Sequence, residues 1–390
     1  MSAWVLPEHI ADVLPRQARQ IEDCRRAFLD TARTYGYELV IPPLVEHIDS
    51  LLSGSGHALD LQTFKLVDLL SGRTLGVRAD TTQQVARIDA HLLNREGVTR
   101  LCYCGPVLHT RPQQPSASRE PLQLGAELYG VQDMGADLEV LRLALDMLMA
   151  SGVANQSAMV VDLADARIVP ALLAQEVQRV NFEQVQTALI TKNAEALTEA
   201  TQALSSAVQQ QLHALLDLYG DVRVLERARA VLPALPEITL ALDQLQWLCT
   251  QAQRSHPDVQ LQIDLADARG YAYYSGIRFA VYVPQASDAL VRGGRYDAVG
   301  AVFGRQRPAV GFSLDVKALA VLGHEAQHTQ AVRTLWSADP AWEQAVRALR
   351  AQGTAVVVDF EQQAASTAMH CLQELVQQAD GQWVLQALRP

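Results

Sequence analysis

The chain has 390 residues, 49% of them hydrophobic and 19% charged, so it is long enough to bury a large core and form two or three domains. Its formal net charge of −11 argues against a surface devoted to nucleic-acid backbones. The five cysteines lack paired Cys-x-x-Cys spacing, and no membrane-length apolar run or leader segment is present, so we expect a cytoplasmic protein without a metal site, a disulfide framework or membrane contact.

The first predicted element is a helix over residues 16–35, where Ile21, Cys24 and Phe28 recur at helical spacing before Gly36. An apolar stretch over 37–46, containing two prolines, predicts a strand. Residues 64–70 and 74–78 then predict a hairpin, because they are joined through a Ser-Gly turn.

Asp80 follows this hairpin at the start of a helix predicted to run to about residue 93. With Gln83 three residues further on, Asp80 forms the pattern of a capping box, and an N-cap is its default role. A carboxylate at a helix start can also face a bound ammonium group, so the cap leaves a ligand role open.

The stretch 101–130 predicts a strand, a long loop rich in Pro, Gln and Ser, and a second strand from about Leu122. On that second strand Gln123, Gly125 and Glu127 point to the same face, and the glycine between the two polar side chains leaves room for a ligand. A leucine-rich helix over 136–149 follows, and the composition of 151–256 predicts mostly helices.

Two further patterns concern the rest of the chain. The sequence DLADAR occurs at 162–167 and again at 264–269, which indicates coincidence or a similar local role at the ends of two strands. Near the C-terminus, 354–359 predicts a buried strand and 364–378 a helix.

The 101–130 hairpin resembles motif 2 of the histidyl-tRNA synthetase family, through Gly105-Pro106 at the end of the first strand and Gln-x-Gly-x-Glu at 123–127. The stretch 37–46 resembles motif 1 of class II synthetases, which reaches a proline in the dimer interface. The segment 269–274, RGYAYY, resembles the Arg-Gly-Leu-Asp-Tyr-Tyr motif of histidine-specific members, with Ala272 at the aspartate position. The segment 293–297 resembles their Gly-Gly-Arg-Tyr-Asp.

The resemblance implies a histidine-binding pocket. Asp80, Thr82 and Gln123 would face the amino group, Arg269 the carboxylate, and Glu127 with Tyr274 the imidazole, while Tyr273 belongs to the same motif. These residue types suit the ligand, because an ammonium group needs polar acceptors, a carboxylate needs a cation and the ring needs polar partners with aromatic walls.

The ATP-binding part of the family pattern is not retained. The motif 2 arginine and glutamate that follow Gly-Pro are replaced in a gap-free reading by His109 and Arg111. In motif 3 the glycine and arginine of Gly-Leu-Glu-Arg are replaced by Asp315 and Ala318, although Lys317 or Arg111 offers a displaced charge. Losing two charge-stabilising donors should slow adenylation by on the order of 10⁴-fold or more.

A chain with a histidine pocket but without these arginines resembles the regulatory subunit family of ATP phosphoribosyltransferase. The resemblance implies a non-catalytic subunit that activates the short-form catalytic subunit and conveys feedback inhibition by free histidine, in the first step of histidine biosynthesis. It further implies a dimer, a hetero-octamer with the catalytic chain, no cofactor and no tRNA. The alternatives are an active histidyl-tRNA synthetase with altered ATP contacts, and a histidine-binding paralogue with another partner.

The expected fold class is α+β, with a class II aminoacyl-tRNA synthetase-like antiparallel sheet flanked by helices. The resemblance places this core in residues 1–150 and 257–320, with a mostly helical insertion at 151–256. Residues 321–390 are expected to form a reduced C-terminal α/β region, since only 71 residues follow Leu319 and a complete anticodon-binding domain needs about a hundred.

Overall fold

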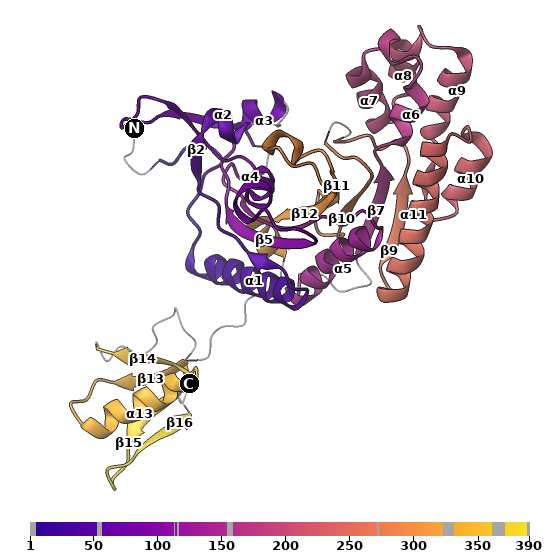
Figure 1. The fold of residues 1–390 in the computed structure, drawn as a ribbon. Helices are drawn as coiled ribbons and strands as arrows, with labels where there is room; N and C mark the ends of the chain where they lie inside the picture. Colours follow the sequence, from indigo (N-terminus) through magenta and orange to yellow (C-terminus); the bar gives the residue numbers. More distant parts are fainter. Residues whose placement is uncertain are drawn as a thin grey trace. The chain divides into compact units, whose positions relative to one another are not determined.

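The computed structural model describes residues 5–52, 57–112, 114, 117–153, 159–270, 273–322, 331–360 and 371–387. The chain divides into two compact units, Met1–His324 and Glu325–Pro390, and each is described by itself (Figure 1). Among the described residues, no helix is both long and apolar enough to cross a membrane.

A nine-stranded sheet is the centre of the first unit. Neighbouring strands are antiparallel except for two parallel pairs, β1 with β5 and β7 with β9. In spatial order the strands are β1 (Glu38–Leu39), β5 (Thr99–Pro106), β6 (Leu122–Tyr129), β12 (Ala309–Asp315), β11 (Val291–Arg295), β10 (Ile277–Tyr282), β7 (Val160–Asp165), β9 (Gln260–Asp264) and β8 (Tyr219–Gly220). This large, mainly antiparallel sheet with helices confirms the expected fold class.

One face of the sheet is apolar and lies under a layer of helices. Leu124, Ala126 and Leu128 of β6 belong to this core, to which helices from several parts of the chain contribute, among them four that precede or follow strands of the sheet. These helices are α1 (Pro15–Thr34), α5 (Gly135–Ala150), α11 (Pro236–Ser255) and α12 (Val316–Leu322). The helices predicted over 16–35 and 136–149 are confirmed. Since side chains alternate along a strand, Gln123, Gly125 and Glu127 lie on the opposite face.

The polar face carries the smaller elements that precede and follow β5 in the chain. A three-stranded antiparallel sheet contains β2 (Val45–His47), β4 (Thr74–Val77) and β3 (Phe64–Val67), which confirms the predicted hairpin. The associated helices are α2 (Ile48–Leu51), α3 (His57–Gln62), α4 (Thr82–Arg87), the π-helix η1 (Ile88–Leu93) and the 3₁₀ turn η4 (Ala301–Phe303).

The strand expected over 37–46 is interrupted. Only β1 and β2 have strand pairing, and the two prolines at 42 and 43 lie between them. Proline has no N–H to donate to a ladder, so the intervening backbone bonds in other ways. The Val40 N–H donates to the carbonyl of Cys102 at 2.9 Å, and Nη1 of Arg78 donates to that of Pro42 at 2.9 Å.

The region 151–256 is mostly helical but also contributes β7 and β8 to the sheet (Figure 1). Its helices before α11 are α6 (Ile168–Leu173), the 3₁₀ turn η3 (Val177–Arg179), α7 (Phe182–Ile190), α8 (Ala194–Thr201), α9 (Ser206–Leu215) and α10 (Val224–Val231). The two DLADAR segments contain the ends of the paired strands β7 and β9. In each, the second aspartate accepts a hydrogen bond from the arginine N–H two residues on, so the repeat reflects a shared local turn.

The second unit is a small α/β structure. Its four-stranded sheet has the order β14-β13-β15-β16 and packs against one helix through Val332, Trp342, Val346, Val356 and Leu375. The elements are β13 (Ala331–Leu335), α13 (Pro340–Ala351), β14 (Ala355–Asp359), β15 (Cys371–Gln377) and β16 (Trp383–Ala387).

The strand predicted over 354–359 is confirmed as β14, whereas the helix predicted over 364–378 is wrong for 371–377, which form β15. Residues 361–370 lie outside the described residues. Pairing of β15 with both β13 and β16 outweighs the local helix preference of its Leu, Glu and Gln residues.

Candidate functional site

A buried glutamate forms the centre of the candidate site. Glu127 lies on β6 and is 1% exposed. The hydroxyl of Tyr103 on β5 donates to its Oε1 at 3.1 Å, and the hydroxyl of Tyr296 donates to its Oε2. Burial raises the pKa of Glu127 to about 8, although both tyrosine hydrogen bonds act in the opposite direction. At neutral pH this carboxyl is therefore mostly protonated.

Aromatic rings form one wall of the site. The ring of Tyr273 stacks on Tyr296 with centroids 5.1 Å apart, and Tyr274 meets Tyr273 edge-on at 5.2 Å. A Cβ atom on either Gly270 or Gly294 would lie 2.9 Å from the ring of Tyr274. These two glycines of the RGYAYY and Gly-Gly motifs thus give the ring its space.

A polar corner adjoins the glutamate at the start of α4. Nε2 of Gln123 donates to Oδ1 of Asp80 at 2.9 Å, and Oε1 of Gln123 accepts from the Thr81 N–H at 2.9 Å. The Thr82 hydroxyl lies 3.2 Å from the Tyr103 hydroxyl, which connects this corner to Glu127.

The predicted helix-start role of Asp80 is partly confirmed. Its Oδ1 accepts from the Thr82 N–H at 3.0 Å, although the residue at the N-cap position is Thr81. The expected capping box with Gln83 is wrong, because Oε1 of Gln83 is buried and has no partner within the described part of the chain.

Arg269 lies apart from this network. Its guanidinium is 3.6 Å from Asp267, its side chain is 48% exposed, and it lines a separate hollow of about 520 Å³ with Arg292 and Asp288. The structure thus brings together six of the seven residues that the sequence indicates and places the seventh at the margin. Ala272, which replaces the family's aspartate, lies outside the described residues.

Sequence reasoning missed the two tyrosines that bond Glu127. Tyr103 lies directly across from Gly125 in the β5–β6 pairing. A Cβ at Gly125 would overlap the Tyr103 hydroxyl, so the glycine of Gln-x-Gly-x-Glu makes room for a side chain of the protein itself. Tyr296 belongs to the recognised Gly-Gly-Arg-Tyr-Asp segment, and its place in that motif could have indicated it as a site residue.

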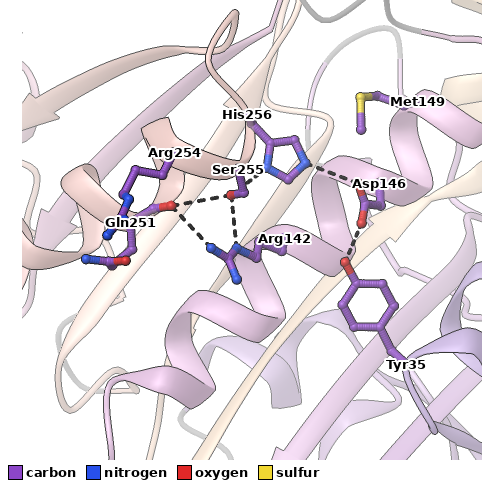
Figure 2. A pocket seen from close by; sticks show the side chains of 8 residues that line it. All are labelled: Tyr35, Arg142, Asp146, Met149, Gln251, Arg254, Ser255 and His256. Carbon is purple, nitrogen blue, oxygen red and sulfur yellow. Dashed lines mark hydrogen bonds and ion pairs between the residues drawn. The ribbon is translucent and has the colours of Figure 1, made fainter.

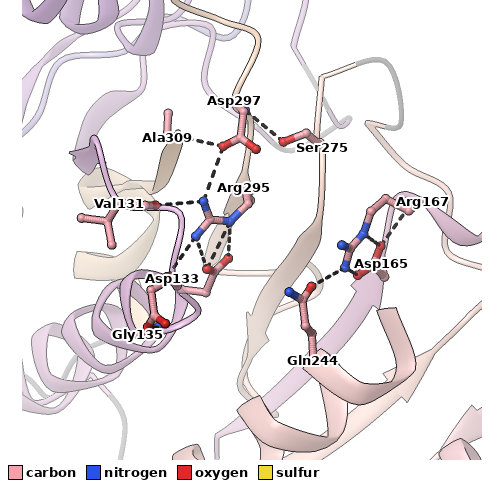
Figure 3. Close-up of polar contacts among 11 residues, drawn as sticks. Val131, Asp133, Gly135, Asp165, Arg167, Gln244, Ser275, Arg295, Asp297 and Ala309 are labelled. Carbon is pink, nitrogen blue, oxygen red and sulfur yellow. Dashed lines mark hydrogen bonds and ion pairs between the residues drawn. The ribbon is translucent and has the colours of Figure 1, made fainter. Parts of the chain in front are cut away.

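The residues flanking Tyr296 fix its backbone (Figure 3). Nε of Arg295 donates to Asp137 on α5 at 3.2 Å, and Nη1 donates to the Val131 carbonyl at 3.1 Å. Oδ1 of Asp297 accepts from the Ala309 N–H at 3.0 Å, and the Asp297 N–H donates to the Ser275 hydroxyl at 2.9 Å. The buried arginine and its acidic neighbour therefore position Tyr296 rather than contact a ligand.

The positions that depart from the family's ATP-binding motifs carry other chemistry. His109 is buried, and its Nε2 donates to the Ala79 carbonyl at 2.9 Å. Asp315 accepts from the backbone N–H groups of Leu122 and Lys317, each at 3.0 Å. The Lys317 ammonium pairs with Glu120 at 3.1 Å, so this displaced charge is already neutralised.

The sheet, the glutamate with its tyrosines and the polar corner define a protein of the histidyl-tRNA synthetase class. The family profile described as histidyl-tRNA synthetase matches residues 9–319, and that of the ATP phosphoribosyltransferase subunit HisZ C-terminal domain matches residues 329–386. The chain belongs to the family of ATP phosphoribosyltransferase regulatory subunits, as its relatives also indicate.

Two relatives carry that name and align along their whole length. The proteins from Variovorax paradoxus and Albidiferax ferrireducens are each 57% identical over 390 residues, covering 100% of both chains. Among solved structures, an ATP phosphoribosyltransferase regulatory subunit/histidyl-tRNA synthetase from Bacillus halodurans is 27% identical, with TM-score 0.80 over 94% of this chain and 96% of that one. Histidyl-tRNA synthetase from Nostoc sp. PCC 7120 is 18% identical, with TM-score 0.80 over 99% and 97%, and shows the shared fold.

Proposed function

We propose that this chain activates a short-form catalytic subunit of ATP phosphoribosyltransferase and conveys feedback inhibition by free histidine. The observation that carries the proposal is that residues suited to binding an amino acid are retained, whereas the residues that would bind ATP phosphates are replaced. The residues suited to an amino acid form a connected network around Glu127, while His109 and Ala318 stand where arginines would bind phosphates and Asp315 replaces the motif 3 glycine.

Each group of histidine has a chemical counterpart in this site. The ammonium group would lie at Asp80, Gln123 and Thr82, whose oxygens can accept its hydrogen bonds. The imidazole would lie between Glu127 and the tyrosine wall, where Tyr274 completes the enclosure. The carboxylate would bind Arg269, whose exposed side chain is free to turn from Asp267 toward the ligand.

Catalytic silence is the second part of the proposal. Adenylation needs fixed cations on the ATP phosphates, and the two arginine positions hold His109, which is buried and bonded to a carbonyl, and Ala318, which carries no charge. Burial raises the pKa of Asp315, partly offset by hydrogen bonds from backbone N–H groups. Asp315 replaces the motif 3 glycine, and neither its neutral nor its ionised form supplies the missing positive charge.

The assembly proposed is a dimer of this chain within a cytoplasmic hetero-octamer with the catalytic subunit. The edge strand β1 and the residues after it support a dimer, because Leu39, Ile41 and Leu44 are 50%, 81% and 43% exposed despite being apolar. Free histidine would have to prefer the less active state of the complex, and a difference of about 1–3 kcal/mol would give ordinary allosteric coupling.

The test is phosphoribosyl-ATP formation by the short catalytic chain from the same source, with and without this protein, at increasing histidine concentration. We expect activity to rise on addition of the chain and histidine to suppress it. Glu127→Ala should blunt the suppression while leaving activation in place, because it removes a polar side chain from the pocket and leaves the surface unchanged. Glu199→Ala, at an exposed position of α8, is the matched control and should behave like the unaltered chain.

The proposal would be contradicted if adding the chain left the rate of phosphoribosyl-ATP formation unchanged at every histidine concentration. Histidine-dependent ATP–pyrophosphate exchange then tests the competing function, an active histidyl-tRNA synthetase. Exchange at a synthetase-like rate would establish that alternative, and its absence would leave a histidine-binding protein with another partner.

A further inference from the structure

A second polar hollow lies in the helical layer, on the side of the sheet away from Glu127. It has a volume of about 490 Å³ and forms where the ends of α1 and α11 meet the last turns of α5 (Figure 2). Tyr35 and His256 are the residues that end α1 and α11, and Arg142 and Asp146 come from α5. The site described above uses none of these residues.

The one carboxylate of the hollow is fully occupied by protein donors. Oδ1 of Asp146 accepts from Nε2 of His256 at 3.1 Å, and Oδ2 accepts from the Tyr35 hydroxyl. Burial opposes ionisation of Asp146, but these hydrogen bonds outweigh it and hold its pKa below the usual value. The carboxylate is hydrogen-bonded to His256 and Tyr35, and the charge of Arg142 also helps to lower its pKa. Within the described residues, however, no ion pair joins Asp146 to either arginine of the hollow.

Two guanidinium groups face this hollow. Arg142 is oriented by two hydrogen bonds, from Nε to the Ser255 hydroxyl at 2.9 Å and from Nη2 to the Gln251 carbonyl at 3.3 Å. Arg254 is exposed, and within the described ranges no hydrogen bond or ion pair holds its side chain. In a chain of net charge −11, two arginines that form no ion pair among the described residues give this hollow a local cationic surface.

The helix end at this hollow does not present free carbonyls to an anion. The Gln251 carbonyl accepts from Arg142, and the Ala252 carbonyl accepts from the His256 N–H at 2.8 Å. The negative end of the α11 dipole is thereby covered by donors. The Ser255 hydroxyl is also engaged, because it accepts from Arg142 and donates to the Ala252 carbonyl at 3.1 Å. What remains available at the hollow is the Nη1 group of Arg142 and the Arg254 guanidinium.

We propose that this hollow binds the anionic group of a small ligand, a phosphate or a carboxylate, between Arg142 and Arg254. The planar N–H groups of arginine match both anions geometrically, and one guanidinium is already held in place. The volume accommodates a small metabolite, and the lining joins α5 to α11, so an occupant would contact both helices.

The test is calorimetric titration of the full chain with inorganic phosphate and, separately, with citrate, at low and at moderate salt. We expect saturable binding that weakens with salt, and a loss of about tenfold or more in affinity with Arg254→Gln or Arg142→Gln, since each removes a charge-assisted donor. Arg229→Gln is the matched control, because it removes an equally exposed charge from α10. Tighter binding of phosphate or of citrate identifies which anionic group the hollow selects.

Chemical modification of the arginines tests whether the anion binds in this hollow. Phenylglyoxal modification of the unaltered chain, read by mass spectrometry, should show Arg254 and Arg142 protected by the tighter-binding anion and Arg229 unprotected. Glu127→Gln should leave this protection unchanged, which separates the hollow from the histidine pocket. Absence of saturable binding, or equal affinity in the unaltered chain and Arg254→Gln, would overturn the proposal.

Discussion

At the scale of single residues, Glu127 makes the stability of the first unit depend on pH. Its pKa in the folded chain is about 8, against an ordinary value of 4.5, because burial disfavours the charged form. Between those values the unfolded chain has released this proton while the folded chain retains it. The contribution to stability is complete below pH 4.5, decreases as the pH rises and is lost above about 8.

We therefore expect the free energy of unfolding of the unaltered chain to fall relative to Glu127→Gln across this window, by at most about 1.4 kcal/mol per pH unit. Urea denaturation at pH 5, 6, 7 and 8 measures both proteins. Other titrating groups are common to the two chains and cancel in the difference. Parallel profiles would show that Glu127 is ionised in the folded state.

Gly125 allows a second test at this scale. A Cβ there would overlap the Tyr103 hydroxyl and lie 2.7 Å from the Phe312 carbonyl oxygen, so Gly125→Ala should displace the tyrosine. Overpacking of this kind costs about 1–3 kcal/mol of folding stability, and it should also weaken histidine binding. Ser313→Ala, directly across the β6–β12 ladder, removes an atom in place of adding one and should cost less in the same denaturation measurement.

Strand alternation put Gln123 and Glu127 on one face of β6, because it is a local property, whereas the tyrosine pair was indicated by the RGYAYY motif alone. The position of Arg269 could not be predicted in the same way. Its direction depends on Asp267 and on Arg292 and Asp288, which come from other parts of the chain. Tyr103 was missed because only the hairpin register places it against Gly125.

At the scale of elements, the contact of α1 with α5 depends partly on one hydroxyl. The Tyr35 hydroxyl donates to Asp146, and burial together with this bond raises the pKa of Tyr35 well above its usual value, so it stays a donor. Tyr35→Phe should lower the free energy of unfolding by about 1–2 kcal/mol, since the partner is charged and partly buried. Tyr219→Phe, at a tyrosine 58% exposed, should change it by less than about 0.5 kcal/mol in the same urea titration. Equal effects would mean that the Tyr35 bond does not contribute.

Elements with a strong local pattern were the ones that sequence could predict. The buried positions of α1 recur every three or four residues, which specifies a helix without knowledge of the rest. In contrast, β15 has leucines and glutamines that suit a helix, and only its two neighbouring strands make it extended. The interruption between β1 and β2 follows from the two prolines, which lack the N–H that strand pairing requires. The sequence alone therefore contained the signal for this break.

At the scale of the whole molecule, we expect a destabilising substitution in one compact unit to leave the other unit folded. Trp342 is 9% exposed in the core of the second unit, and its Nε1 donates to the Thr334 hydroxyl at 2.9 Å. Removing such a side chain costs about 3–5 kcal/mol, which is as much as a core of this size supplies. Trp342→Ala should thus unfold Glu325–Pro390 and leave histidine binding by the first unit intact.

Limited proteolysis, combined with a histidine-binding measurement, checks this expectation. Cleavage should concentrate in the second unit of Trp342→Ala. Trp336→Ala, at a tryptophan 62% exposed, should resist protease like the unaltered chain. Loss of histidine binding in Trp342→Ala would show that the units depend on each other.

The parallel pairing of β7 with β9 has a consequence for how this family can change over evolutionary time. Parallel neighbours cannot be joined by a tight turn, and α11 already packs back along β7 and β10 to complete the crossover. The helices from α7 to α10 are thus an excursion whose ends are anchored at adjacent strands. Doubling the length of such an excursion costs only about 0.6 kcal/mol in closure entropy. Descendants can therefore lengthen, trim or replace it while the strands that carry Glu127 and its tyrosines keep their register.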